Sequence, residues 1–205
     1  MAFLSSNERV FLRAVSSLGY SNPFLPERIQ YEREALGRDF RESESVWSMR
    51  VDDPERPHDN LLKIMERVET VVRALRDRLA SGTAATREDL VVYEDAVLFL
   101  LYHRYRDHLT EAILRALDEK RGTRRFGFYA EFLRDWEQYF HIPSVRLPTT
   151  QEAPHLFACF FQVRRAFHHI FSYIIGGSMA AARLRAAVWQ SIFTHDMRRY
   201  RDTLY

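Results

Sequence analysis

Basic and histidine side chains recur at helical spacing in an apolar stretch near the C-terminal end of this chain. Arg164, His168 and Ser172 lie four residues apart, and so do Arg165 and His169. Residues four apart share one face of a helix, so this spacing predicts a basic stripe along a largely apolar helix. A buried cation without a partner is costly. We therefore interpret the stripe as a surface for an anionic effector or for an acidic part of the same protein.

The candidate ligand-binding set combines the stripe with three basic residues that follow it. The set is Arg164, Arg165, His168, His169, Arg183, Arg185 and His195. Residues 155–205 contain seven arginines and two aspartates, a net charge of +5, against −3 for the preceding residues and +2 for the whole chain. This local excess of positive charge favours an anionic partner more than the overall charge does.

A haem or metal site is the alternative use of the histidines. His155 and Cys159 are four apart, and His168 and His169 follow on the same predicted helix. Imidazole and thiolate both bind zinc, and either can bind haem iron. The single cysteine excludes an internal disulfide and a multi-cysteine metal site. We favour no metal and no cofactor, and keep these four residues as the alternative ligands.

Motifs for catalysis and nucleotide binding are missing from the chain. It contains neither a Gly-x-Ser-x-Gly elbow nor a Walker A sequence, so we expect no enzymatic activity and assign no catalytic residue. The Gly176-Gly177-Ser178 segment could bind an anion at a helix start, although such a pair more often forms a turn between helices. A polar cluster, HRYRDH at 103–108, we interpret as the end of a helix emerging into solvent.

Helical periodicity dominates the elements that must position these residues. Apolar residues recur at spacings of three and four, and no stretch alternates like a strand. We expect helices over residues 6–18, 26–36, 59–80, 87–119, 126–140 and 155–175, and from 178 onward. Gly19 is placed to end the first, and Thr86 with Asp89 forms a capping box before the fourth. The prediction is an all-α domain of seven or eight helices with a buried, aromatic-rich central rod at 155–175.

The ends of the chain and its location follow from composition. We expect residues 1–193 to form one regulatory domain and residues 194–205 to begin a linker helix. No signal peptide is evident, and no run of about 18 uncharged apolar residues exists, which favours a cytoplasmic protein without a membrane span. The basic tail after residue 197 lacks any DNA- or RNA-binding signature, so we expect no direct contact with nucleic acid.

Three strings in this sequence resemble a known protein family. HLFACFFQVRRAFHHIF (155–171) and GGSMAAARLRAAVWQSIFTHDMRRY (176–200) are similar to the region before the ATPase in a group of bacterial sigma-54-dependent transcriptional activators. SLGYSNPFLPER (17–28) is similar to the start of the same group. The resemblance implies an N-terminal input domain, followed by an AAA+ ATPase that remodels sigma-54 RNA polymerase. The chain then corresponds to the input domain alone, cut at the linker.

The functional expectation combines these observations. We expect a regulatory domain that senses a signal and controls an attached ATPase, with residues 155–175 as a wall of the sensing core and residues 178–205 as the output helix. The effector would be an anion or a surface of the same protein. The alternatives are a haem or metal sensor, and an oligomerisation module without a ligand; a homo-oligomer is expected.

Overall fold

The computed structural model describes residues 2–42, 59–118, 126–148 and 152–193. All regular structure in these ranges is helical, so the predicted all-α class is confirmed. Seven α-helices lie there: Ser6–Tyr20 (α1), Glu27–Leu36 (α2), Asp59–Ala80 (α4), Arg87–Asp118 (α5), Tyr129–Phe140 (α6), Ala153–Tyr173 (α7) and Met179–Phe193 (α8). A short 3₁₀ helix, Gly37–Asp39 (η1), follows α2.

Local capping explains where two of the helices begin. Ser5 and Glu8 form a reciprocal capping box at α1, and the helix begins at residue 6, as predicted. Thr86 and Asp89 form the predicted box before α5, with hydrogen bonds of 3.1 and 3.2 Å. The prediction that Gly19 ends α1 is wrong, because the helix continues to Tyr20.

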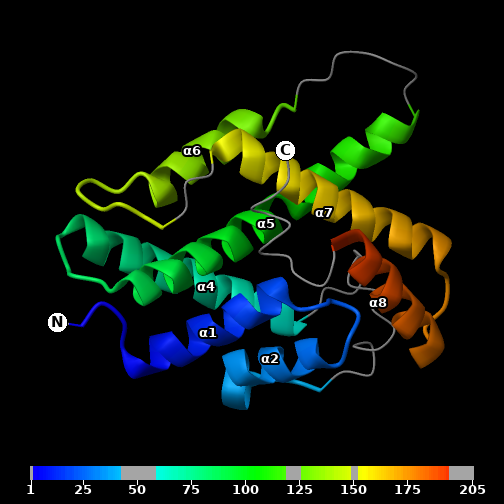
Figure 1. Ribbon diagram of the computed structural model, residues 1–205, viewed down its shortest axis with the longest axis horizontal. Coiled ribbons are helices and arrows are strands. Elements are labelled where there is room, and N and C mark those ends of the chain that lie inside the picture. The colour runs from blue at the N-terminus through cyan, green and yellow to red at the C-terminus, as the bar shows by residue number, and fades with distance from the viewer. Residues whose placement is uncertain (1, 43–58, 119–125, 149–151, 194–205) are drawn as a thin grey trace.

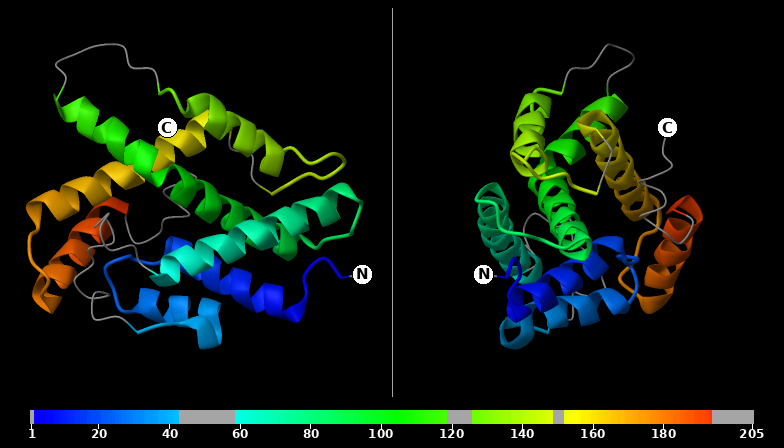
Figure 2. Two further views of the ribbon diagram at one scale, coloured as in Figure 1. Left: turned by 180° about the vertical axis from the view of Figure 1, so that it is seen from behind. Right: turned by 60° about the vertical axis from the view of Figure 1, so that its left-hand side comes forward.

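Helix α5 lies at the centre of the fold. It packs against α1 and α4 on one side and against α6 and α7 on the other (Figure 1). Helix α2 lies beside α1 and α4, at the edge of the molecule. Helix α8 folds back on the C-terminal half of α7, away from α4 and α6 (Figure 2). The most apolar helix of the sequence, α7, therefore joins the central helix to the last one.

Buried apolar side chains form two separate clusters. The larger extends from α1 and α4 through α5 to α6 and the first half of α7. Where α5, α6 and α7 meet, the ring of Phe132 contacts those of Tyr105, Phe157 and Phe160 at centroid distances of 5.2–6.1 Å. The smaller cluster lies between α7, α8 and the α1–α2 connection, and comprises Phe24, Ile170, Ala186, Trp189 and Phe193. Helix α8 thus depends on a much smaller core than α5 does.

Gly19 offers a test of how the first helix is packed. A Cβ at this position would lie 3.5 Å from the Phe99 ring, an ordinary van der Waals contact, and the backbone is helical. We expect Gly19→Ala to stabilise the protein by about 0.5–1 kcal/mol, since Gly loses more backbone entropy on folding than Ala. The control is Gly37→Ala, where φ is +55° and no atom lies within 4 Å, so backbone strain should destabilise by about 1–2 kcal/mol. Urea denaturation of both variants measures the two changes, and equal effects would contradict the assignment.

Candidate functional site

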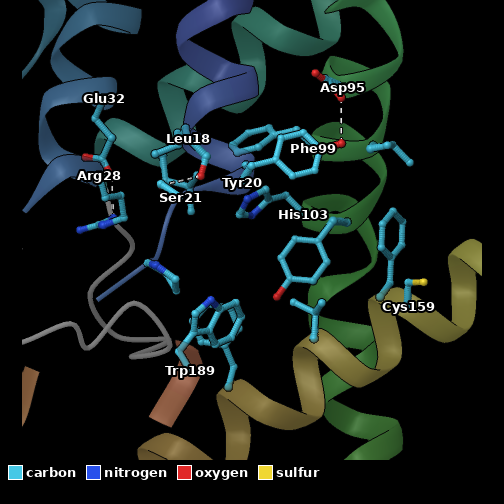
Figure 3. A pocket seen from close by; sticks show the side chains of 18 of the residues that line it. Leu18, Tyr20, Ser21, Arg28, Glu32, Asp95, Phe99, His103, Cys159 and Trp189 are labelled. Carbon is cyan, nitrogen blue, oxygen red and sulfur yellow. Dashed lines mark hydrogen bonds and ion pairs between the residues drawn. The ribbon is translucent and has the colours of Figure 1, made fainter. Parts of the chain in front are cut away.

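A cavity of about 180 Å³ lies between the two clusters. Its wall comes from the end of α1, the α1–α2 connection and helices α2, α4, α5, α7 and α8, so residues from both ends of the described chain meet there (Figure 3). Most of the wall is apolar and includes Leu98, Phe99, Phe160, Val163, Phe167 and Trp189. A small number of charged and polar side chains interrupt this wall. Such a concave, mostly apolar space with a few polar groups is the usual form of a small-molecule site.

The cavity has one helix of each cluster on opposite sides. Helix α5 contributes Phe99 from the larger core and also His103, whereas α8 contributes Trp189 from the smaller core. Figure 3 shows His103 and Trp189 facing the space from these two helices. Helix α7 spans the gap with Phe160 and Phe167. Any molecule that fills the cavity would therefore contact both clusters at once.

A buried carboxylate on α5 forms the first polar part of the wall. Asp95 accepts hydrogen bonds from the hydroxyl groups of Ser16 at 2.6 Å and Tyr20 at 2.8 Å. It is 5% exposed and follows a second buried acidic residue, Glu94. The two hydroxyl donors compensate for the loss of hydration of its charge, and they join the C-terminal end of α1 to α5.

An ion pair on α2 forms the second polar part. Arg28 and Glu32 are four residues apart, both buried, and joined by a 2.5 Å bond from Nη1 to Oε1. Burial lowers the pKa of Arg28, while the carboxylate of Glu32 opposes this change. The second terminal nitrogen, Nη2, is also buried and has no hydrogen-bond partner among the described residues. One donor of this guanidinium is therefore left for another acceptor.

His103 forms the third polar part of the wall. On α5 it lies about one helical turn after Phe99 and two turns after Asp95. Its ring contacts the rings of Phe99 and Tyr102, with centroids 4.4 and 5.1 Å away. Burial, reinforced by the positive charge of Arg106 and Arg164, lowers the pKa of His103 to about 3. The imidazole is thus neutral at neutral pH. Its Nδ1 atom is buried and has no hydrogen-bond partner within the described part of the chain.

Two of the predicted anion-binding residues make hydrogen bonds within the fold. Arg164 is buried, and its Nε donates to the hydroxyl of Thr110 on α5 at 2.6 Å. Arg185 is buried on α8 and donates to the carbonyl oxygens of Ile174 and Gly176 at 2.6–3.1 Å. These carbonyls lie just after α7, so Arg185 ties the turn between the last two helices to α8.

The other predicted residues lie away from the cavity. Arg165 and His169 line a second, open hollow between α7 and α8, where the His169 ring stacks on Tyr173. The His168 ring lies 5.4 Å from that of His169, and Arg183 is exposed on α8. His195 lies outside the described residues. The six described residues therefore do not converge on one site, because positions 164 and 165 point about 100° apart around a helix. An anion site at the second hollow stays a prediction.

The alternative metal ligands are brought together only as a pair. His155 Nε2 lies 3.6 Å from Cys159 Sγ. Within the described ranges, no three His, Cys, Asp or Glu side chains are grouped so that they could hold a metal ion. The haem or metal site at His155, Cys159, His168 and His169 stays a prediction.

Sequence reasoning missed the charged residues of the cavity. The interpretation of 103–108 as a helix emerging into solvent is right for Asp107 and His108, which are exposed, but wrong for Tyr105, which is buried, while His103 is half-buried. The signal that could have pointed to α5 was the pair Glu94 and Asp95, two acidic residues within an otherwise apolar run. Arg28 and Glu32 carry no such signal, because i,i+4 ion pairs are common on exposed helix faces.

Comparison with known proteins finds no matching family model, no matching curated protein and no matching solved structure. In the part of the chain that the structure describes, no helix combines the length and the apolar character needed to cross a membrane. The cavity and the resemblance of the three sequence strings are therefore the two observations that bear on function.

Proposed function

We propose that this chain is a cytoplasmic regulatory domain whose cavity binds a small, largely apolar molecule, and that binding controls an attached AAA+ ATPase acting on sigma-54 RNA polymerase. The cavity between the two clusters is the observation that carries the sensing role. The ATPase and the polymerase enter only through the sequence resemblance. The domain itself would be a binding module, without catalytic residues and without direct contact to nucleic acid, within a homo-oligomer.

The size of the cavity supports a ligand of about one ring. Apolar cavities of about 150 Å³ can hold benzene, and this one measures about 180 Å³. The rings of Phe99, Phe160 and Phe167 form part of the wall on α5 and α7. Burying apolar ligand surface here would contribute roughly 25 cal/mol for each Å² removed from water.

The position of α8 supports a route from the ligand to the next domain. Trp189 on α8 contributes to the wall, and its ring contacts Phe167 on α7 at 4.6 Å and Phe24 at 5.8 Å. A ligand that touches Trp189 and the α5 wall together would favour the arrangement in which α8 is docked. Such a ligand shifts the population of docked molecules by its differential affinity for the two arrangements. Helix α8 would then be the output helix.

A cavity-filling variant tests the binding role. Ring-sized molecules such as benzyl alcohol should change the tryptophan fluorescence of the unmodified chain, because Trp189 lines the cavity, and should raise its melting temperature. In Val163→Phe, the added ring should occupy the cavity and abolish both effects. The matched control is Val10→Phe, the same change on the exposed face of α1, where Val10 is 63% exposed. Circular dichroism checks that both variants are folded. Unchanged binding by Val163→Phe, or no binding by the unmodified chain, would contradict the proposal.

A second measurement addresses regulation. ATP hydrolysis by the native polypeptide that contains residues 1–205 should change when the cavity is occupied, and Val163→Phe should remove this dependence. If a ligand binds in the cavity and the rate of ATP hydrolysis does not change, the cavity does not control the ATPase as proposed.

A further inference from the structure

We propose that the second hollow, between α7 and α8, is a docking groove for an acidic, amphipathic helix of a partner protein. The hollow measures about 460 Å³ and shares no lining residue with the cavity. The inference therefore concerns a different surface from the proposed ligand site and does not depend on that site.

The hollow has a mostly apolar floor that both helices form. On α7 the floor includes Ala166 and Ile170, and on α8 it includes Val188 and Ile192. Residues four apart share one face of a helix, so each helix presents a row of apolar side chains to the hollow. Along α7 the lining runs from residue 162 to 173, a length of about 17 Å or three helical turns. A floor of this length fits a short amphipathic helix, which commonly binds by laying its apolar face into such a groove.

Apolar side chains are exposed in and around the hollow. Eight large hydrophobic residues are exposed in the described ranges, and five of them lie between residues 173 and 192. Two of the five line the hollow itself, Tyr173 at 81% and Ile192 at 44% exposure. Leu184 lies four residues before Val188 and extends the row on α8. Single exposed apolar residues are ordinary, whereas a group of them on one pair of helices indicates an interaction surface.

The edge of the hollow is basic. Arg165 is exposed there, with His169 one helical turn further along α7, and Arg183 is exposed on α8. Helices α7 and α8 contain no Asp or Glu within their bounds, so neither helix supplies a carboxylate to these side chains. A partner with acidic residues beside its apolar face would add opposite charges at this edge, which favours correct docking and fast association.

Two other occupants have the wrong charge for this surface. Pairing the hollow with the same hollow of a second copy would bring two basic edges together, and like charges oppose such an interface. Residues 194–205 directly follow Phe193, which lines the hollow, but their side chains include three arginines and two aspartates, a net charge of +1. A membrane surface is flat, whereas a hollow between two helices accommodates a third helix. The acidic helix of a different protein is therefore the occupant that these observations favour.

Three fluorescently labelled peptides of about 18 residues, long enough to form helix, test the inference. The acidic peptide has leucine at the a and d positions of each heptad, glutamate at e and g, and alanine elsewhere, which produces one apolar face with acidic edges. The basic peptide has lysine in place of glutamate. The scrambled peptide keeps the acidic composition and spreads its leucines around the helix. By fluorescence anisotropy at pH 7 and low salt, we expect the 205-residue chain to bind the acidic peptide about tenfold more tightly than the other two.

Matched substitutions connect this binding to the hollow. Arg165→Glu should weaken the acidic peptide about tenfold and strengthen the basic one, whereas Arg134→Glu, on the exposed face of α6 away from α8, should change neither by more than about twofold. Ile192→Glu places a charge on the apolar floor and should weaken the acidic peptide about tenfold. Its control is Val10→Glu, at an exposed apolar position of α1, which should leave binding unchanged. Circular dichroism checks that all four variants are folded.

Several results would overturn the inference. It is wrong if the basic or the scrambled peptide binds as tightly as the acidic one, if none of the three binds, or if Arg165→Glu and Ile192→Glu leave the affinity unchanged. Binding to phosphatidylserine vesicles without binding to any peptide, reduced by Ile192→Glu, would make the surface a membrane contact. Self-association without peptide binding, lost in Ile192→Glu and measured by analytical ultracentrifugation, would make a second copy the occupant.

Discussion

Glu32→Gln is expected to destabilise the protein by about 3–5 kcal/mol. Glu32 is 1% exposed and holds the buried guanidinium of Arg28, which the substitution would leave charged and without a counter-charge. Removing one partner of a buried ion pair typically costs this much, because the remaining charge keeps its desolvation penalty. The free energy of unfolding from urea denaturation measures the loss.

Two controls show whether the effect comes from the buried charge. The double variant Arg28→Met with Glu32→Leu removes both charges and should recover most of the lost stability, since apolar residues of similar size often replace a buried pair at little cost. Glu42→Gln breaks the Arg33–Glu42 pair, whose side chains are 56% and 82% exposed, and should change stability by less than about 1 kcal/mol. A loss below 1 kcal/mol in Glu32→Gln would mean that the pair at the cavity is not effectively buried.

Lowering the pH from 6.5 to 5 is expected to remove up to about 2 kcal/mol of stability through His103 alone. Its pKa is lowered from 6.5 to about 3 by burial and by two nearby arginines, so the unfolded chain binds more protons than the folded protein in this range. Stability is therefore fully present above pH 6.5 and is lost as the pH falls toward 3. One pH unit in this window corresponds to about 1.4 kcal/mol.

His103→Phe should flatten this part of the pH profile, because the variant has no imidazole to protonate on unfolding. Glu8 provides an internal reference. Its hydrogen bonds to Arg78 lower its pKa from 4.5 to about 2, so its contribution is lost only below pH 4.5 and should remain in the variant. Urea denaturation at half-unit steps from pH 7 to 2 measures both windows. An equal loss between pH 6.5 and 5 in the variant and the unmodified chain would show that His103 is accessible to protons.

Helix positions were largely predictable, because periodicity and capping are local properties of the chain. The long helix α5 begins at its predicted box and ends within one residue of the expected position. The error at Gly19 has a tertiary cause. Gly is unfavourable inside a helix, but the hydrogen bond from the Tyr20 hydroxyl to Asp95 on α5 holds one further residue in α1.

The site was much less predictable, because it depends on which helices pack together. The basic residues of α7 formed a plausible stripe, yet Arg164 faces α5 and Arg165 faces outward. The charged groups of the cavity come from α2 and α5, which the sequence separates by about 60 residues. No spacing rule joins residues at that distance, whereas their packing on α1 brings them to the same cavity.

The small core behind α8 has a consequence for sensitivity. Besides that cluster, the side chain of Asn22 donates to the carbonyl of Ala186, and Arg185 donates to the turn after α7. Local opening of such a unit costs less than global unfolding.

A ligand at one hundred times its dissociation constant can favour the docked form of α8 by at most about a hundredfold, or 2.7 kcal/mol. If α8 is docked in about one molecule in ten without ligand, the apparent affinity for the ligand is about tenfold below that of the docked form. The fraction of docked molecules can then still rise about tenfold when the ligand binds. The hydrogen bonds of Asn22 and Arg185 would thus set the dynamic range of the proposed sensor. Firmer docking of α8 raises the apparent affinity for the ligand and reduces the change in the docked fraction on binding.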